Sequence, residues 1–161
     1  MANPQSFQVE ILLFTQRNSS QILKAGDEIA AQIQTEFEPE ALTLTQDSFE
    51  GSQAEFVKKL ALTAPGRSLV LTIGGTGIGP EDFVPEATIE VCERLLPGIP
   101  ELMRSQGASS TSKAWLSRYQ CGLIGSCLIL NLPGRPSSAL ESYQAAKELI
   151  FHIMKKIRKC H

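Results

Sequence analysis

The feature that most constrains the fold of this chain is an apolar run that ends abruptly in glycines. Residues Leu69 to Ile73 have the pattern of a buried strand, and Gly74, Gly75 and Gly77 follow at once. Glycine tolerates positive φ and lets backbone N–H groups approach an anion closely. Pro85 suits the first turn of a helix, whose N-terminal dipole also favours negative charge. The segment therefore predicts a strand-to-helix turn suited to binding a phosphate.

A carboxylate, Asp82, lies between these glycines and the predicted helix. Beside a phosphate it would repel the ligand unless a divalent cation such as Mg²⁺ bridged the two groups. The segment therefore indicates a magnesium-bound nucleotide or a similar phosphate ester. No Gly-Lys-Ser/Thr sequence follows, which excludes a Walker A loop, and Pro80 stands where the third glycine of the dinucleotide fingerprint would be. A purely structural turn is the alternative that this segment alone leaves open.

Length and composition indicate one globular domain over residues 1–161. Hydrophobic residues make up 42%, charged residues 20%, and the formal net charge is −2, so no basic excess exists to attract nucleic acid. The N-terminus lacks a basic segment, and the apolar run from Ile11 to Phe14 is too short for a signal peptide or a membrane span. We expect a cytoplasmic protein without nucleic-acid or membrane partners. Without Cys-x-x-Cys spacing, most of the cysteines are expected to be buried thiols, with Cys160 exposed.

Hydrophobic periodicity predicts strands that alternate with helices. The predicted strands cover Phe7 to Thr15, Ala41 to Thr45, Leu69 to Ile73 and Leu123 to Leu130. The predicted helices cover residues 20–37, 51–62, 85–95, 99–106 and 137–158. This alternation implies an α/β fold, a three-layer sandwich in which a mostly parallel sheet is flanked by helices.

Three candidate polar features fall where predicted strands end: Asp47, the loop from Gly74 to Asp82, and residues Asn131 to Pro136. In parallel sheets, ligands lie outside the carboxyl ends of the strands. We therefore expect the three features to share one site. Taken singly, Asp47 and Asp82 could each cap the helix that follows them.

Four motifs follow one another along the chain. They are Thr72-Ile73-Gly74-Gly75-Thr76-Gly77, Asp82 with Pro85-Glu86-Ala87-Thr88, Leu116-Ser117-Arg118 with Gly122, and Leu132-Pro133-Gly134 with Pro136. In this order and spacing they resemble the molybdopterin adenylyltransferases of molybdenum-cofactor biosynthesis, the MogA/MoaB type that includes the G domain of gephyrin. The resemblance runs from about Asp47 to the C-terminus. It implies a MogA/MoaB-like fold and a homo-oligomer, either a trimer or a hexamer.

The resemblance also implies an enzyme that transfers AMP from Mg-ATP to the terminal phosphate of molybdopterin and releases pyrophosphate. It assigns catalysis and Mg²⁺ binding to Asp47 and Asp82. The residues that it implies for binding molybdopterin or the nucleotide are Gly74, Gly75, Thr76, Gly77, Glu86, Ser117, Arg118, Pro133, Gly134 and Pro136. A phosphate nucleophile needs little base catalysis, so the work would be positioning, metal bridging and charge neutralisation.

The sequence departs from the family pattern at three places. Thr15-Gln16-Arg17 runs quickly into the next helix where members usually carry Ser-Asp and a longer loop, Glu81 replaces an arginine, and Val84 replaces a helix-capping threonine. Glu81 puts an anion near a polyanionic ligand. Two alternatives to the enzyme therefore remain open. One is a binding protein that has kept the pterin or nucleotide pocket but lost catalysis, and the other is a structural unit of an oligomer.

Overall fold

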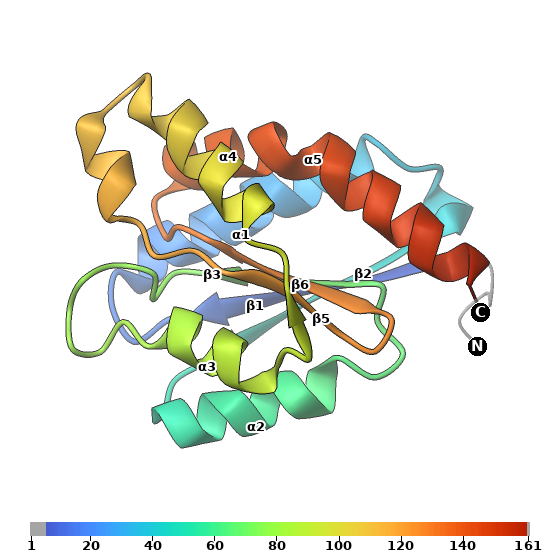
Figure 1. Ribbon diagram of the computed structural model, residues 1–161, viewed down its shortest axis with the longest axis horizontal. Helices are drawn as coiled ribbons and strands as arrows, with labels where there is room; N and C mark the ends of the chain where they lie inside the picture. Colours follow the sequence, from blue (N-terminus) through green and yellow to red (C-terminus); the bar gives the residue numbers. More distant parts are fainter. Residues whose placement is uncertain (1–5, 161) are drawn as a thin grey trace.

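The structure, a computed structural model, describes residues 6–160 and is built on one six-stranded sheet (Figure 1). The strands are β1 Phe7–Phe14, β2 Leu42–Phe49, β3 Leu69–Ile73, β4 Arg94–Leu95, β5 Cys121–Ile124 and β6 Cys127–Leu132. Their order across the sheet is β2-β1-β3-β6-β5-β4. Strands β2, β1, β3 and β6 are parallel to one another, whereas β5 is antiparallel to both of its neighbours. The sheet is thus mostly parallel, as predicted.

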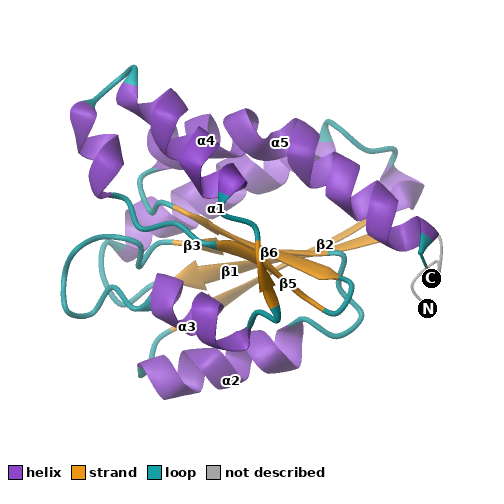
Figure 2. Cartoon of the chain, in the orientation of Figure 1, coloured by secondary structure: helices purple, strands orange, loops and turns teal. Residues whose placement is uncertain are grey.

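Helices cover both faces of the sheet (Figure 2). They are α1 Ser19–Gln34, α2 Gln53–Thr63, α3 Val84–Val91, α4 Gly98–Ala108 and α5 Pro136–Lys159, with short 3₁₀ turns η1 Pro39–Ala41 and η2 Ser112–Leu116. Helices α1, α4 and α5 pack on one face, and α2 and α3 on the other. Within residues 6–160, none is long and apolar enough to cross a lipid bilayer. The arrangement confirms the predicted three-layer α/β sandwich.

Alternation along the strands separates two apolar cores. In β1, Ile11 and Leu13 pack with residues of α1 and α5, while Leu12 and Phe14 pack with residues of α2 and α3. Each of these four side chains is at most 4% exposed. Parallel strands that are buried on both faces read as nearly continuous apolar runs, which explains the apolar stretch from Ile11 to Phe14 in β1 and the one from Leu69 to Leu71 in β3. The two cores fix the carboxyl ends of these strands, and with them the loops that follow.

The region after α3 differs from the prediction in two places. The helix predicted to reach Leu95 ends at Val91, and Arg94–Leu95 forms the edge strand β4. The strand predicted from Leu123 to Leu130 is a hairpin of β5 and β6, which turns at Gly125 with φ 54°. A glycine with positive φ allows this tight turn. Pairing of β4 with β5 across the chain overrides the helical spacing of the apolar residues.

Strand β2 is longer than predicted, and this changes the position of Asp47. The prediction ended the strand at Thr45, whereas the strand continues to Phe49. Because β2 is an edge strand, its second half is exposed and polar, so polarity does not mark its end. Asp47 does not cap α2 either, since the side chain of Ser52 accepts from the backbone N–H of Glu55 in a capping box. Asp47 therefore lies within the strand.

The winding of the sheet reverses between β1 and β3. From β1 the chain passes through α1 to β2 on one side, and it then reaches β3 on the other side. The crevice outside the carboxyl ends of the strands at such a switch is the usual ligand position in this class of fold. The loops that follow β1, β3 and β6 come together at this end of the sheet, at the left in Figure 1.

Candidate functional site

The loop after β3 turns so sharply that it requires glycine at two positions. Gly74 and Gly75 have φ of 96° and 67°, values that residues with a side chain rarely adopt. A Cβ on Gly75 would lie 2.5 Å from Cγ2 of Val84 in α3. The backbone N–H groups of Gly75, Thr76 and Gly77 donate to no acceptor in the described part of the chain. The loop therefore presents free hydrogen-bond donors to a ligand at the carboxyl end of β3.

Asp82 closes this loop next to α3. Its Oδ2 accepts a hydrogen bond from the backbone N–H of Gly79 at 2.9 Å. A Cβ on Gly77 would lie 2.8 Å from the same oxygen, so the absence of a side chain there makes room for the carboxylate. The other oxygen, Oδ1, has no donor among residues 6–160. Helix α3 begins after Phe83 without a side-chain cap, so Asp82 does not cap it, and Oδ1 is available to a ligand.

Arg118 ties the glycine loop to α3. Its Nε donates to the carbonyl of Gly77 at 2.7 Å, and its Nη2 donates to the carbonyl of Asp82. Its Nη1 pairs with the carboxylate of Glu86. The backbone N–H of Arg118 also donates to the carbonyl of Thr76 at 3.2 Å. The geometry thus gives Arg118 and Glu86 a part in holding the loop in shape, in addition to the ligand contact expected from the sequence.

A buried polar network supports α3 from below. Nδ2 of Asn131 donates to Oγ1 of Thr72 at 3.0 Å and to Oγ1 of Thr88 at 2.9 Å. Oδ1 of Asn131 accepts from the backbone N–H of Gln120 at 3.0 Å. Oγ1 of Thr88 in turn donates to the carbonyl of Val84, the first residue of α3. These bonds join β3, β6 and α3, and so fix the start of the helix beside Asp82.

A cavity of about 430 Å³ opens at the glycine loop, a size common among small-molecule sites. The loops after β1, β3 and β6, the start of α1 and the turn η2 form its walls. The structure brings together here these residues predicted from the sequence: Gly74, Gly75, Thr76, Gly77, Asp82, Ser117, Pro133 and Gly134. Pro136 is the first residue of α5 and lines neither this cavity nor the smaller one described below.

The same cavity is lined by three cations that were not predicted as ligands from the sequence: Arg17, Lys113 and Arg135. Asp82 is the single acid among the described residues that line it. Lys113 and Arg135 are exposed and form no ion pair with any residue the structure describes. The cavity is therefore electropositive and suits an anionic ligand. Arg17 and Arg135 could have been identified from their positions in the sequence, because they follow the ends of β1 and β6 closely.

The N-terminus of α1 faces this cavity as well. Asn18 lines the cavity and has φ 51°, the left-handed conformation that asparagine tolerates better than most residues. Its carbonyl accepts from the backbone N–H groups of Gln21 and Ile22. The N–H groups of Ser19 and Ser20 have no acceptor within the described residues. A helix start of this kind adds partial positive charge to the site.

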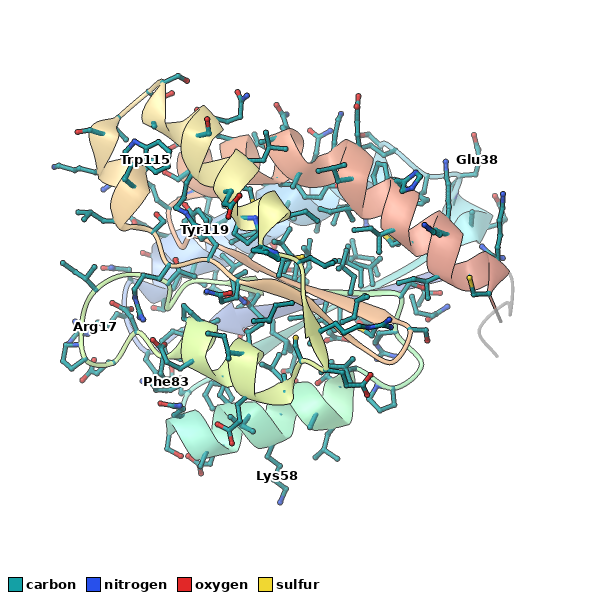
Figure 3. The ribbon with its side chains drawn as sticks, in the orientation of Figure 1. Arg17, Glu38, Lys58, Phe83, Trp115 and Tyr119 are labelled. Carbon is teal, nitrogen blue, oxygen red and sulfur yellow. The ribbon has the colours of Figure 1, made fainter. Side chains whose placement is uncertain are left out.

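Arg17 and Glu81 form an ion pair between the β1–α1 loop and the glycine loop, with Nε 2.6 Å from Oε2. Arg17 lies at the same end of the molecule as Phe83 (Figure 3). The two paired side chains are 61% and 52% exposed, so the pair adds little to stability. Glu81 lines neither cavity. The carboxylate of Glu81, which the sequence placed near the ligand, is thus paired with Arg17.

A second cavity, of about 370 Å³, shares Ile78 and Asp82 with the first. It is lined by the first residue of α2, by the loop before α3 and by the paired Glu86 and Arg118. Asp82 therefore stands in the wall between two cavities. A carboxylate in this position can act on groups that arrive from both sides.

Asp47 is not part of either cavity, which corrects the expectation that it shares a site with Asp82. It lies on the face of β2 that is covered by α2, and it forms an ion pair with Lys59 of that helix. The hydrogen bond from Lys59 is the main cause that lowers the pKa of Asp47. No group of three or more histidine, cysteine or acidic side chains among residues 6–160 could hold a metal ion. A metal at Asp82 would therefore depend on ligands supplied by the substrate.

Comparison with known proteins places this geometry in a family. Residues 20–152 match the model of a family described as a probable molybdopterin binding domain. The molybdopterin adenylyltransferase of Helicobacter pylori is 47% identical over 77 residues, which are 48% of this chain and 44% of that protein. The chain thus spans less than half the length of this curated relative.

Solved structures match over almost the whole chain. The molybdopterin biosynthesis Mog protein from Mycobacterium ulcerans has a TM-score of 0.80 at 26% identity, covering 98% of this chain and 99% of that one. The molybdopterin biosynthesis enzyme MoaB from Thermus thermophilus has a TM-score of 0.73 at 37% identity, with 94% and 96% covered.

Proposed function

Because the chain belongs to the family of molybdopterin-binding domains, we propose that it transfers AMP from ATP to the terminal phosphate of molybdopterin and releases pyrophosphate. The observation that carries this proposal is the electropositive cavity around Asp82. Free N–H groups from Gly75 to Gly77 and the cations Arg17, Lys113 and Arg135 all line it. Such a set of donors suits phosphate groups.

In the proposed reaction, an oxygen of the molybdopterin phosphate attacks the α-phosphorus of ATP. A new P–O bond forms as the bond to the β-phosphate breaks, and pyrophosphate carries the electron pair away. The free amides and the cations hold the phosphates in line and neutralise the negative charge that develops on them. Arg118 and the network around Asn131 keep the loop and α3 in place while this happens.

Mg²⁺ fits this site through one carboxylate. Oδ1 of Asp82 is free within the described residues, and Mg²⁺ is commonly held by one or two carboxylates together with substrate phosphates and water. When bound, the ion would neutralise phosphate charge beside Asp82. Asp47 is not proposed as a second ligand, because it pairs with Lys59 away from both cavities.

The test compares two matched substitutions. Asp82→Asn should lower the formation of adenylylated molybdopterin by about two orders of magnitude, as expected when a group that stabilises transition-state charge is lost. Asp47→Asn should change it by less than about threefold, since that carboxylate pairs with Lys59 on the surface of α2. Product chromatography and pyrophosphate release measure both. Undiminished transfer by Asp82→Asn would remove Asp82 from the mechanism.

A binding protein without turnover is the second candidate. It is favoured by the absence of a second carboxylate beside Asp82 among the residues that line the larger cavity. Titration calorimetry with molybdopterin, combined with the pyrophosphate assay on the unaltered protein, separates the two candidates. Binding without release supports the second, and release supports the first.

We propose further that the protein is a cytoplasmic homo-oligomer, a trimer or a hexamer. Several large apolar side chains on α1, α3 and α5 are exposed in the single chain, namely Leu23, Ile89 and Leu149, and such side chains are available for contact between copies. Multi-angle light scattering at micromolar concentration should give a mass of three or six chains. A monomer would contradict the oligomer without affecting the proposed reaction.

A further inference from the structure

Arg17 combines a fixed backbone with a long, exposed side chain. The backbone N–H of Thr15 donates to the carbonyl of Phe49 at 3.0 Å, and the carbonyl of Asn18 accepts the first hydrogen bonds of α1. Arg17 stands between these two anchors, in the wall of the larger cavity. Its side chain is 61% exposed, and an arginine held by nothing else would lose much rotamer freedom on binding a ligand. A partner that holds the guanidinium in advance reduces that cost.

Glu81 belongs to a tight turn that is closed from both sides. The backbone N–H of Asp82 donates to the carbonyl of Gly79 at 3.0 Å, and the backbone N–H of Gly79 donates to Oδ2 of Asp82 at 2.9 Å. Pro80 and Glu81 are the two central residues of this turn, and a proline at the first of these positions fixes φ. The carboxylate of Glu81 therefore extends from a rigid support next to Asp82.

The ion pair between these two side chains leaves part of the guanidinium free. Oε2 of Glu81 lies 2.6 Å from Nε of Arg17, while Nη1 and Nη2 of Arg17 have no acceptor among residues 6–160. Arg17 lines the larger cavity, whereas Glu81 lines neither cavity. The carboxylate thus contacts the guanidinium outside the cavity, and the two Nη atoms remain available to an anion inside it.

The guanidinium lies close to Asp82 without pairing with it. A Cβ on Gly79 would lie 2.9 Å from Oδ2 of Asp82 and 3.9 Å from Nη1 of Arg17, so both side chains border the same residue. Within residues 6–160, the ion pair of Arg17 is with Glu81 and not with Asp82. An arginine this near would otherwise be attracted to Asp82. The pair with Glu81 therefore keeps Oδ1 of Asp82 open to a ligand.

From these contacts we infer that Glu81 is a positioning residue, which holds Arg17 beside Asp82 with two nitrogens free for an anionic ligand in the larger cavity. The sequence suggested the opposite, an anion that repels the ligand. The inference rests on the proposed function where it places a phosphate in this cavity. An exposed ion pair changes an equilibrium constant by up to about fivefold, and this limits the size of the effect.

The experiment is a double-mutant cycle on the dissociation constant of inorganic pyrophosphate with Mg²⁺, measured by titration calorimetry in the absence of molybdopterin and ATP. Arg17→Met should weaken binding about tenfold or more, because a charge-assisted contact with phosphate is lost. Glu81→Gln removes the repulsion between Glu81 and the ligand in both backgrounds, so only its effect through Arg17 differs between them. We expect Glu81→Gln to raise the dissociation constant about two- to fivefold more when Arg17 is present than in Arg17→Met.

Equal effects of Glu81→Gln in the two backgrounds would overturn the inference, because Glu81 would then act on the ligand by its charge alone. Tighter binding confined to the background that has Arg17 would overturn it too, since Glu81 would then compete with the ligand for the guanidinium. The same holds if the unaltered protein does not bind pyrophosphate.

The matched control is Glu28→Gln, which removes the same charge from another exposed ion pair, the one with Lys24 on α1. Neither residue lines the larger cavity, so the dissociation constant should hardly change. Thermal unfolding should give Glu81→Gln the stability of the unaltered protein, which separates positioning from a general loss of structure. The proposed transfer is judged separately, by product formation with ATP and molybdopterin. Transfer without coupling between Glu81 and Arg17 would leave the reaction standing and the inference refuted.

Discussion

Replacement of Asn131 by alanine should destabilise the protein by about 3 to 4 kcal/mol, because the side chain makes three buried hydrogen bonds that each contribute about 1 kcal/mol. The residue is 0% exposed, so water does not readily replace these bonds. The backbone N–H of Gln120 loses its acceptor as well. For a chain of 161 residues, this loss corresponds to a melting temperature about 10 °C lower.

The same substitution should lower turnover, because the network sets the position of α3. Thr88 joins Asn131 to the carbonyl of Val84 in the first turn of the helix, and Asp82 lies two residues earlier. A catalytic group displaced by about 1 Å costs on the order of 100-fold in rate. Thermal unfolding gives the stability, and pyrophosphate release below the melting temperature gives the rate.

A double-mutant cycle supplies the control. Thr88→Val removes one partner of Asn131 and should cost about 1 to 2 kcal/mol by itself. Since the two residues share a bond, their combined effect should fall short of the sum by about 1 kcal/mol. A loss below about 1 kcal/mol for Asn131→Ala, or strict additivity with Thr88→Val, would refute the role given to this network.

Three further predictions concern the loop, the core and the thiols. Gly75→Ala should lower the free energy of unfolding by about 2 kcal/mol or more, because φ is 67° and the new Cβ would lie 2.5 Å from Val84 in α3. Titration calorimetry should show that ATP binding is lost. Wild-type affinity would contradict the role of the loop. Arg67→Met should lower the free energy of unfolding in urea by about 3 kcal/mol, because it leaves the buried carboxylate of Glu10, 8% exposed and 3.2 Å from Nη2 of Arg67, with the hydroxyl of Thr45 but without its cation. A loss below about 1 kcal/mol would contradict this. Burial raises the pKa of the Cys92 thiol to about 11 and those of Cys121 and Cys127 to about 12. A thiol reagent at pH 8 should therefore label only the exposed Cys160 rapidly in the native protein. Rapid labelling of two or more thiols would contradict this.

The strands at the centre of the sheet could be predicted from the sequence because their signal is local. Strand β3 was predicted with the bounds that the structure has, Leu69 to Ile73. Burial on both faces makes every residue of the strand except Thr72 apolar, and a glycine marks its end. The strand at Phe7 and the long last helix were placed within a residue or two for similar reasons.

The edges of the sheet could not be predicted in this way. The pairing of β4 with β5 joins Arg94 to Leu123, and nothing in the local sequence of either segment records that contact. The edge strand β2 was predicted too short, because exposure makes its second half polar and so hides its true end at Phe49. Asp47 was therefore placed at the end of a strand although it lies within one.

The site itself was predicted in part. The motif residues of the glycine loop and of Pro133-Gly134 lie together at one cavity, because strand carboxyl ends meet at one edge of the sheet. Lys113 was missed because it lies in the turn η2, away from any strand end, and only the folded chain brings it to the cavity. Arg17 and Arg135 were missed although their positions after β1 and β6 were a usable signal. The sequence also could not separate ligand contacts from support, as the contacts of Arg118 with Gly77 and Glu86 show.

The placement of the two ends of the described chain has a consequence for engineering. The guanidinium of Arg158 lies 4.9 Å from the ring centroid of Phe7, so the start of β1 and the end of α5 are neighbours. At its other end, about 25 Å away along the strand, β1 reaches the larger cavity through Phe14, and α5 begins, about 35 Å away along the helix, directly after Arg135 in the wall of the same cavity. A short linker could therefore join the ends, and the chain could be opened instead at the turn around Gly66, where an added Cβ meets nothing within 4 Å. Such a circular permutant would keep both cavities intact while moving its termini.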